Sequence, residues 1–377
     1  MSLILTKAKE AYVAARGYHT NRKLVCIESD DWGSIRMPSK QTFDKLISLG
    51  DNPQDDAFLS NDCLECQNDL DALFEVLSGV SDRWGRPAVI TANFAVANPD
   101  FDRIDYKYGI YEYEPFLRTY ERYYPNGNIK GIIDEGVKEK VFVPQLHCRE
   151  HLNVNRWMQD LGTHKKDTCL AFDNKMIGTG TSFSQDNPFG YMDAFNANWT
   201  TEPELEKIVD DAAKIFCDAF GYESKTFVAS CFVWNASLER ILREKGLIGI
   251  QTAEWQNLPR KTANGYGYRR VLHYAGQKNR EGQVYSVRNC SFEPAITNDP
   301  EASEEKCFRE VARAFAVGKP AVINSHRLNY ISCINPDNAK KNLASLTKLL
   351  NRIVETYDDA EFISSDNLIE IMLKELR

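Results

Sequence analysis

Acidic and imidazole side chains follow three apolar runs of the sequence that read as buried strands. Asp30 and Asp31 come directly after the first run, and His147 ends the third, with His151 four residues further on. His326 ends a late run near the carboxyl end of the chain. In a parallel α/β barrel the active site lies at the carboxyl ends of the strands, so these five side chains are expected to meet there.

Each of these residue types suits a step of metal-assisted hydrolysis. Two histidines and one carboxylate are a common ligand set for a catalytic divalent metal, and they leave positions open for water and substrate. Of Asp30 and Asp31, one carboxylate can bind the metal while its neighbour accepts a proton from water. An imidazole at the position of His326 can protonate a leaving group.

Each residue also has a simpler interpretation. The spacing of His147 and His151 places two imidazoles on one face of a helical turn, where they could be a surface pair. Asp30 and Asp31 could cap a helix after a turn, and His326 could be a structural hydrogen-bonding residue. The joint occurrence at strand ends favours the catalytic interpretation over these alternatives.

The elements that must position these residues alternate along the chain. Short runs rich in Val, Ile and Phe, apolar on both faces, predict strands that are covered on both sides. Amphipathic stretches with apolar residues three and four apart predict helices between them. This order predicts an α/β fold with a parallel sheet, either barrel or open. The first strand is followed by SDDWGS and not by a glycine-rich dinucleotide loop, which speaks against the open Rossmann type. The predicted strands cover residues 24–29, 87–95, 141–147, 226–234, 247–253, 284–289, 321–326 and 361–365.

Two segments interrupt this alternation. Residues 101–127 are rich in tyrosine, and residues 178–200 are rich in Gly, Asn and Ser. Both are predicted to be long loops or insertions over one face of the barrel. The tyrosines could stack on sugar rings, or pack at a half-buried surface or between subunits of a homo-oligomer. The run GYGYRR at 265–270 is predicted to be a turn.

Composition excludes several other classes of protein. The chain has 377 residues, 43% of them hydrophobic, and a formal net charge of −8. Such a composition can build a hydrophobic core. The sequence has no basic run of the kind that indicates nucleic-acid binding. No apolar run reaches the roughly 20 residues that a membrane span requires. The N-terminal stretch is apolar only from Leu3 to Leu5, so it predicts a helix and not a signal peptide, and a cytoplasmic location is expected.

The order of these motifs resembles the polysaccharide deacetylase, or NodB-homology, family of carbohydrate esterases. ESDDWGS at 28–34 is similar to the family's first motif, HCREH at 147–151 to its second, and INSH at 323–326 to a late one. EFISSDNLIEIM at 361–372 is similar to the closing segment. The resemblance covers nearly the whole chain and implies a distorted (β/α)7 TIM-like barrel of the glycoside hydrolase and deacetylase type. A single domain over 1–377 is therefore expected.

The resemblance also implies a role for each residue. Asp30 would be the general base, His326 the general acid, and Asp31, His147 and His151 the metal ligands. The implied reaction is hydrolysis of an acetyl group on an acetylated sugar or polysaccharide. Zinc is the expected metal for nitrogen and oxygen ligands, although cobalt, nickel and iron suit the same set.

The sequence departs from the family at its third motif. An arginine that orients the base should fall near residues 227–239, and none is present there. Arg149 or Arg288 could replace it from elsewhere in the chain. Trp255 is a weak match to the aromatic residue near the acetate pocket.

Two other functions stay open on the sequence alone. A glycoside hydrolase would need a carboxylate at some distance from the aspartate pair, and Glu150, Glu254 and Glu293 are candidates. A barrel that binds carbohydrate but has lost catalysis would explain the missing arginine.

Overall fold

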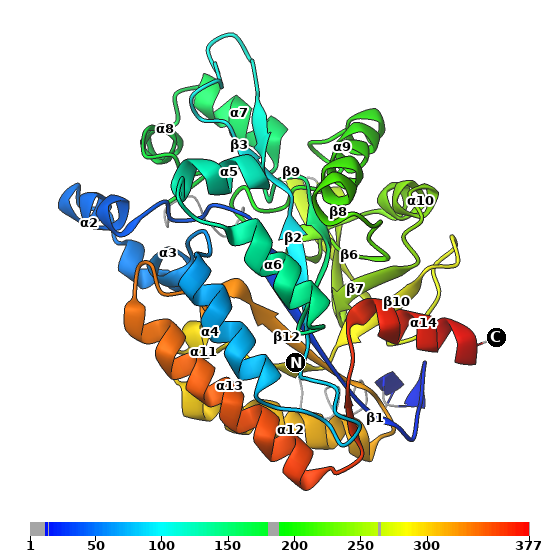
Figure 1. The fold of residues 1–377 in the computed structure, drawn as a ribbon. Coiled ribbons are helices and arrows are strands. Elements are labelled where there is room, and N and C mark those ends of the chain that lie inside the picture. The colour runs from blue at the N-terminus through cyan, green and yellow to red at the C-terminus, as the bar shows by residue number, and fades with distance from the viewer. Residues whose placement is uncertain (1–11, 14, 180–187, 263–264, 377) are drawn as a thin grey trace.

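The parallel sheet forms a barrel, which confirms the predicted fold class. The computed structural model describes residues 12–13, 15–179, 188–262 and 265–376 (Figure 1). Seven strand positions run in the order β10, β7, β6, β5, β2, β1, β12. The strands are β1 (Lys23–Trp32), β2 (Ile90–Ala95), β5 (Phe142–Cys148), β6 (Thr226–Val228), β7 (Gly249–Ala253), β10 (Val284–Arg288) and β12 (Ala321–His326).

One stretch of chain closes the barrel. β10 pairs with β7, and after a single residue the chain continues as β11 (Cys290–Ser291), which pairs with β12. The intervening Asn289 donates its backbone N–H to Val322 O at 3.0 Å. The two ends of the sheet are thereby joined, which makes this a distorted (β/α)7 barrel. A short strand, β13 (Ala360–Phe362), adds to the start of β1.

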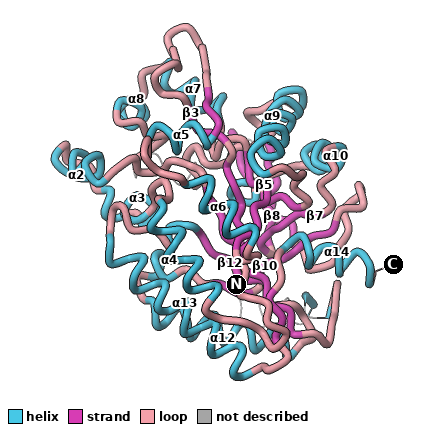
Figure 2. Tube along the Cα trace, in the orientation of Figure 1, coloured by secondary structure: helices cyan, strands magenta, loops and turns pink. Residues whose placement is uncertain are grey.

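Helices cover the outside of the barrel, and strands run through its centre (Figure 2). Their amphipathic patterns place apolar side chains against the sheet, in one large core and, for the last helix of the chain, in a smaller one. The covering helices are α4 (Gln67–Ser78), α6 (Ile129–Lys138), α9 (Glu202–Phe220), α10 (Ala236–Glu244), α12 (Pro300–Ala316), α13 (Pro336–Thr356) and α14 (Ser365–Glu375). No helix in the described part of the chain is long and apolar enough to cross a membrane.

The segment 101–127 contains more regular structure than a loop. β4 (Tyr113–Pro115) pairs with β3 (Ala97–Pro99), and α5 (Phe116–Tyr123) follows it. Together with α7 (Val154–Gly162) and α8 (Lys166–Asp173), this region has a small core of its own. The core consists of Phe101, Ile104, Leu152, Trp157, Leu161, Ile177, Tyr191 and Met192. Part of the other predicted insertion, residues 180–187, lies outside the described residues.

The turn predicted at 265–270 is wrong. These residues belong to β9 (Gly265–Leu272), which pairs antiparallel with β8 (Trp255–Thr262) in a hairpin. Most of the hairpin's described side chains are exposed or half-buried. The hairpin therefore lacks the continuous apolar pattern by which the barrel strands were recognised.

β1 ends in a tight turn that depends on glycine. Gly33 has φ of 79°, and a Cβ atom there would lie 2.7 Å from Ala95 O. We expect Gly33→Ala to lower the free energy of unfolding by about 3 kcal/mol or more, because strain of the left-handed backbone adds to a clash with rigid backbone.

Gly282→Ala is the matched control, because Gly282 has φ of 80° but open space around its Cβ position. It should cost only the backbone strain, about 1–2 kcal/mol. Urea denaturation of both variants measures the difference, and equal losses would contradict the proposed clash.

Candidate metal centre and active site

Asp31, His147 and His151 form a cluster at the carboxyl end of the barrel. Asp31 Oδ1 lies 3.4 Å from His147 Nε2 and 3.5 Å from His151 Nε2. One ligand atom from each of the three residues lies within 4.8 Å of the others. These are the three residues that the sequence predicted as metal ligands.

A bulge in β1 brings both neighbouring aspartates to the site. Adjacent residues of a regular strand point to opposite faces. Here the pairing of β1 with β2 shifts register between Ser29 and Trp32, and Asp31 has φ of 76°. The irregular backbone turns the Asp31 side chain toward the histidines, while Asp30 keeps the inward position of a strand residue. Sequence alone predicted two useful carboxylates here, but not how consecutive residues could reach one site.

The two histidines reach the cluster differently from the sequence prediction. His147 lies in β5, and His151 lies in the loop between β5 and α7, so the predicted helical turn is wrong. His147 Nδ1 donates to Val228 O at 2.8 Å, which leaves Nε2 facing the cluster. Burial opposes protonation of His147, but Asp31 and Asp30 raise its pKa. Burial lowers the pKa of His151 to about 3, so its imidazole is neutral near pH 7.

The donor atoms suit a divalent cation. Asp31 Oδ1 is buried and has no hydrogen-bond partner among the described residues, although two imidazole nitrogens face it. Burial opposes ionisation of Asp31, but the two neighbouring imidazoles and the Arg36 guanidinium together hold its pKa well below the usual range. Two imidazoles, which bind a metal in their neutral form, and one carboxylate are the donor set of many catalytic zinc sites.

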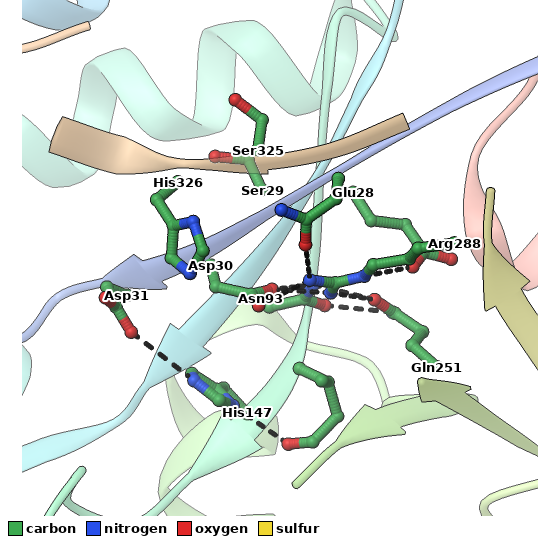
Figure 3. Close-up of polar contacts among 12 residues, drawn as sticks. Glu28, Ser29, Asp30, Asp31, Asn93, His147, Gln251, Arg288, Ser325 and His326 are labelled. Carbon is green, nitrogen blue, oxygen red and sulfur yellow. Dashed lines mark hydrogen bonds and ion pairs between the residues drawn. The ribbon is translucent and has the colours of Figure 1, made fainter. Parts of the chain in front are cut away.

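Asp30 is held by a buried arginine. Arg288 donates to both oxygens of Asp30, from Nη1 at 2.6 Å and from Nη2 at 2.7 Å, and its Nε donates to Glu28 at 2.7 Å (Figure 3). Asn93 Nδ2 donates to Asp30 Oδ1 at 2.7 Å. Such a two-point contact fixes the plane of the carboxylate as well as its position.

Arg288 is thus the one of the two suggested arginines that contacts Asp30. Of the two substitutes that the sequence offered, Arg149 is engaged elsewhere, with Glu150 and Asp211. Burial would raise the pKa of Asp30, but the charge and hydrogen bonds of Arg288 outweigh it and lower the pKa to about 2. Asp30 is consequently ionised throughout the neutral range.

His326 lies beside Asp30 on the neighbouring strand. The two residues are register partners in the pairing of β1 with β12. His326 Nδ1 lies 2.6 Å from Glu293 Oε1, and Asn324 and Asn329 donate to the Glu293 carboxylate. Burial would lower the pKa of His326, but the charge and hydrogen bond of Glu293 raise it to about 9.

The three glutamates considered for glycoside hydrolysis differ in their bonding partners and surroundings. Glu150 is bound by Arg149 at 2.6 and 2.7 Å, and Glu293 is bound to His326. Glu254 lines a cavity of about 800 Å³ next to Arg288 and Trp255. The cavity adjoins the Arg288 side of the site, and none of the three metal-site residues lines it.

Apart from Arg288, sequence reasoning missed the side chains that contact the five predicted residues or hold those contacts in place. Glu28 could have been found from the sequence, because a charged residue inside an apolar strand implies a buried partner. Asn93, Gln251 and Arg36 could not, since their contacts with the site depend on the barrel geometry. Arg36 Nη2 lies 3.2 Å from Asp31 Oδ2.

Comparison with known proteins finds similar structures at low sequence identity. No protein-family model matches the sequence, and the search of curated proteins found no relative. A candidate polysaccharide deacetylase from Pseudomonas aeruginosa PAO1 is 9% identical, with 96% of each chain covered and a TM-score of 0.49. A candidate polysaccharide deacetylase from Mycobacterium smegmatis is 11% identical, with 96% of this chain and 94% of that chain covered and a TM-score of 0.47. The Puue allantoinase is 9% identical, with 94% and 93% covered and a TM-score of 0.47.

Two of these three structures are described as members of the family that the sequence motifs resemble. At such identities and TM-scores, however, the likeness says nothing about activity.

The pairing of Arg288 with two buried carboxylates predicts a large loss of stability when the arginine is replaced. We expect Arg288→Met to lower the free energy of unfolding at pH 7 by about 3–5 kcal/mol, because Glu28 and Asp30 are left buried without a counter-charge. The pKa of Asp30 is lowered from 3.8 to about 2, so this stabilisation exists above about pH 4 and disappears as the pH falls toward 2.

Urea denaturation at several pH values measures both effects. Arg122→Met is the control, because Arg122 also pairs with carboxylates but its side chain is 39% exposed, and it should cost about 1 kcal/mol or less. A loss for Arg288→Met no greater than this control, or one that persists unchanged at pH 2, would contradict the assigned role of the ion pair.

Proposed function

We propose that the protein is a metal-dependent hydrolase that removes acetyl groups from an acetylated sugar or polysaccharide. The observation that carries the proposal is the meeting of a two-histidine, one-carboxylate cluster with an ionised aspartate and a protonated histidine at one end of the barrel. Metal-assisted hydrolysis of an amide or ester needs these groups together.

Asp31, His147 and His151 would hold the ion, with zinc as the proposed metal. When bound, such an ion lowers the pKa of water and polarises a carbonyl group. The hydrogen bond of His147 Nδ1 to Val228 O orients its ring with Nε2 toward the site. The neutral state of His151 also prepares the site, because a protonated imidazole cannot ligate a metal.

Asp30 would act as the general base. Arg288 and Asn93 occupy part of its hydrogen-bonding capacity, but a carboxylate has about four lone-pair positions and retains others for a water molecule. The strong pairing with Arg288 keeps Asp30 ionised and oriented, so that it can accept a proton from the attacking water.

His326 would act as the general acid. Glu293 binds its Nδ1 and keeps the ring protonated, which leaves Nε2 to donate a proton to the departing amine or alcohol. The low pKa of Asp30 and the high pKa of His326 thus favour opposite protonation states at neutral pH. This separation is the usual mark of an acid and base pair.

The arrangement favours acyl hydrolysis over glycoside hydrolysis. Glycosidases use two carboxylates about 5–9.5 Å apart on either side of the bond. Of the three glutamates suggested for the second carboxylate, Glu150 and Glu293 are each bound to a cationic side chain. Acetyl groups on carbohydrate are proposed because the sequence motifs resemble those of carbohydrate deacetylases.

Metal content tests the ligand assignment. The purified protein should contain about one divalent ion per chain, and His147→Ala and His151→Ala should each lower the affinity for zinc by at least about tenfold. Elemental analysis and zinc titration measure both, and His164→Ala, which removes an exposed histidine, is the control. Retention of the ion by both site variants would contradict the assignment.

The pH dependence of acetate release tests the role of His326. Because the acid must be protonated, kcat/KM should fall as the pH rises through about 9. Glu293→Gln removes the charge that raises this pKa, so the fall should move to lower pH by about one unit or more.

Glu361→Gln is the control for this profile, since Glu361 pairs with Arg22 and Arg86 at the opposite end of β1. Its profile should match that of the unaltered protein. An unchanged alkaline limb in Glu293→Gln would contradict the proposed acid.

A further inference from the structure

The hairpin of β8 and β9 carries an unusual excess of positive charge. From Trp255 to Arg280 the chain has six basic residues and no acidic one, in a protein with a net charge of −8. Four of the six lie on the two hairpin strands, namely Arg260, Lys261, Arg269 and Arg270. The sequence shows no basic run here because the charges are divided between two strands.

These four cations have no carboxylate partner among the described residues. All four are exposed, whereas most basic side chains near the barrel mouth are paired, such as Arg36, Arg149 and Arg288. Like charges held close together on a short hairpin repel one another. A set of unpaired cations of this kind is typical of a surface that binds an anion.

The pairing register divides the cations between the two faces of the hairpin. Directly opposite residues share a face, and Lys261 lies opposite Tyr266 while Arg270 lies opposite Asn257. Positions two apart on a strand also share a face, so Lys261 and Arg270 are on the face of Trp255 and Tyr268. Arg260 and Arg269 are on the other face, since Arg269 lies opposite Leu258.

The face of Lys261 and Arg270 is turned toward the candidate active site. Tyr268 OH donates to Asp193 Oδ2 at 2.8 Å, and Asn153 Nδ2 donates to Asp193 Oδ1 at 3.2 Å. Asn153 is two residues from the proposed metal ligand His151. At the base of the hairpin, Trp255 lines the same cavity as Arg288, which holds Asp30.

Aromatic rings lie among the cations on this face. Tyr266 is 49% exposed and its ring centroid is 5.4 Å from that of Trp199. Arg270 lies 5.6 Å from the centroid of Trp255. Aromatic faces pack against the apolar faces of sugar rings, and arginine and lysine bind carboxylate, phosphate or sulfate groups.

We infer that this face of the hairpin binds the anionic groups of a negatively charged acetylated glycan and presents the glycan to the active site. The inference rests on the proposed function for the chemistry of the substrate, but the hairpin's binding can be measured without hydrolysis. It narrows the substrate to acidic carbohydrate, and it assigns Lys261 and Arg270 as specificity-determining residues.

The experiment compares two hexasaccharides that both carry N-acetyl groups. A hyaluronan hexasaccharide is anionic, and chitohexaose is neutral. Titration calorimetry with the full-length, zinc-loaded protein should show the hyaluronan fragment binding at least about tenfold more tightly at low salt. The excess should disappear at about 1 M salt, where exposed charges are screened.

Two double variants separate the faces of the hairpin. Lys261→Gln with Arg270→Gln should abolish the tenfold preference. Arg260→Gln with Arg269→Gln removes the same charge from the other face. This double variant should reduce the preference for the hyaluronan fragment by no more than about threefold. Unchanged zinc content in both variants verifies that the barrel is folded.

Several results would overturn the inference. Equal affinity for the two glycans, binding of neither, or equal loss in the two double variants would each do so. A DNA oligonucleotide of the same charge, bound as tightly as hyaluronan and weakened by the same variant, would overturn the assignment to carbohydrate. None of these results affects acetate release or metal content, so a failure here is distinguishable from a failure of the proposed hydrolase.

Discussion

The buried ion pairs of Arg288 are the interaction on which the rest of the site depends. One guanidinium joins Glu28 and Asp30 of β1 to β10, and it also donates to Asn324 of β12. Two carboxylates placed two residues apart on an inward-facing strand would otherwise repel each other in a medium of low polarity. The arginine makes their burial tolerable, and the same contact keeps Asp30 ionised. The contacts of Arg288 therefore both stabilise the carboxyl end of the barrel and keep the proposed base ionised.

The barrel supplies the second constraint, which is the convergence of strand ends. Asp30, His147 and His326 are far apart in the sequence, yet parallel strands bring their carboxyl ends to one side of the sheet. Within that arrangement the local surroundings differ. Arg288 lowers the pKa of Asp30, and Glu293 raises the pKa of His326. Neighbouring positions on β1 and β12 thus acquire opposite preferences for a proton without any change in fold.

Much of the fold and the positions of the site residues could be predicted from the sequence, for identifiable physical reasons. The barrel strands are apolar on both faces, so their positions were evident, and polar residues at their ends stood out. The β8–β9 hairpin was missed because it is half-exposed and its charges are spread over two strands. The approach of Asp31 to the histidines depends on a bulge, and the rescue of Asp30 by Arg288 depends on contact between strands 258 residues apart. Neither the bulge nor the contact between distant strands produces a local pattern in the sequence. The proposed roles of the five residues remain predictions of chemistry.

We propose that Asp31, His147 and His151 bind one catalytic metal ion beside Asp30. Anomalous diffraction at the zinc absorption edge, from crystals grown with zinc, tests this most directly. We expect a single strong peak about 2.0–2.2 Å from one oxygen of Asp31 and from the Nε2 atoms of both histidines. A peak at another cluster, with these three side chains unliganded, would contradict it.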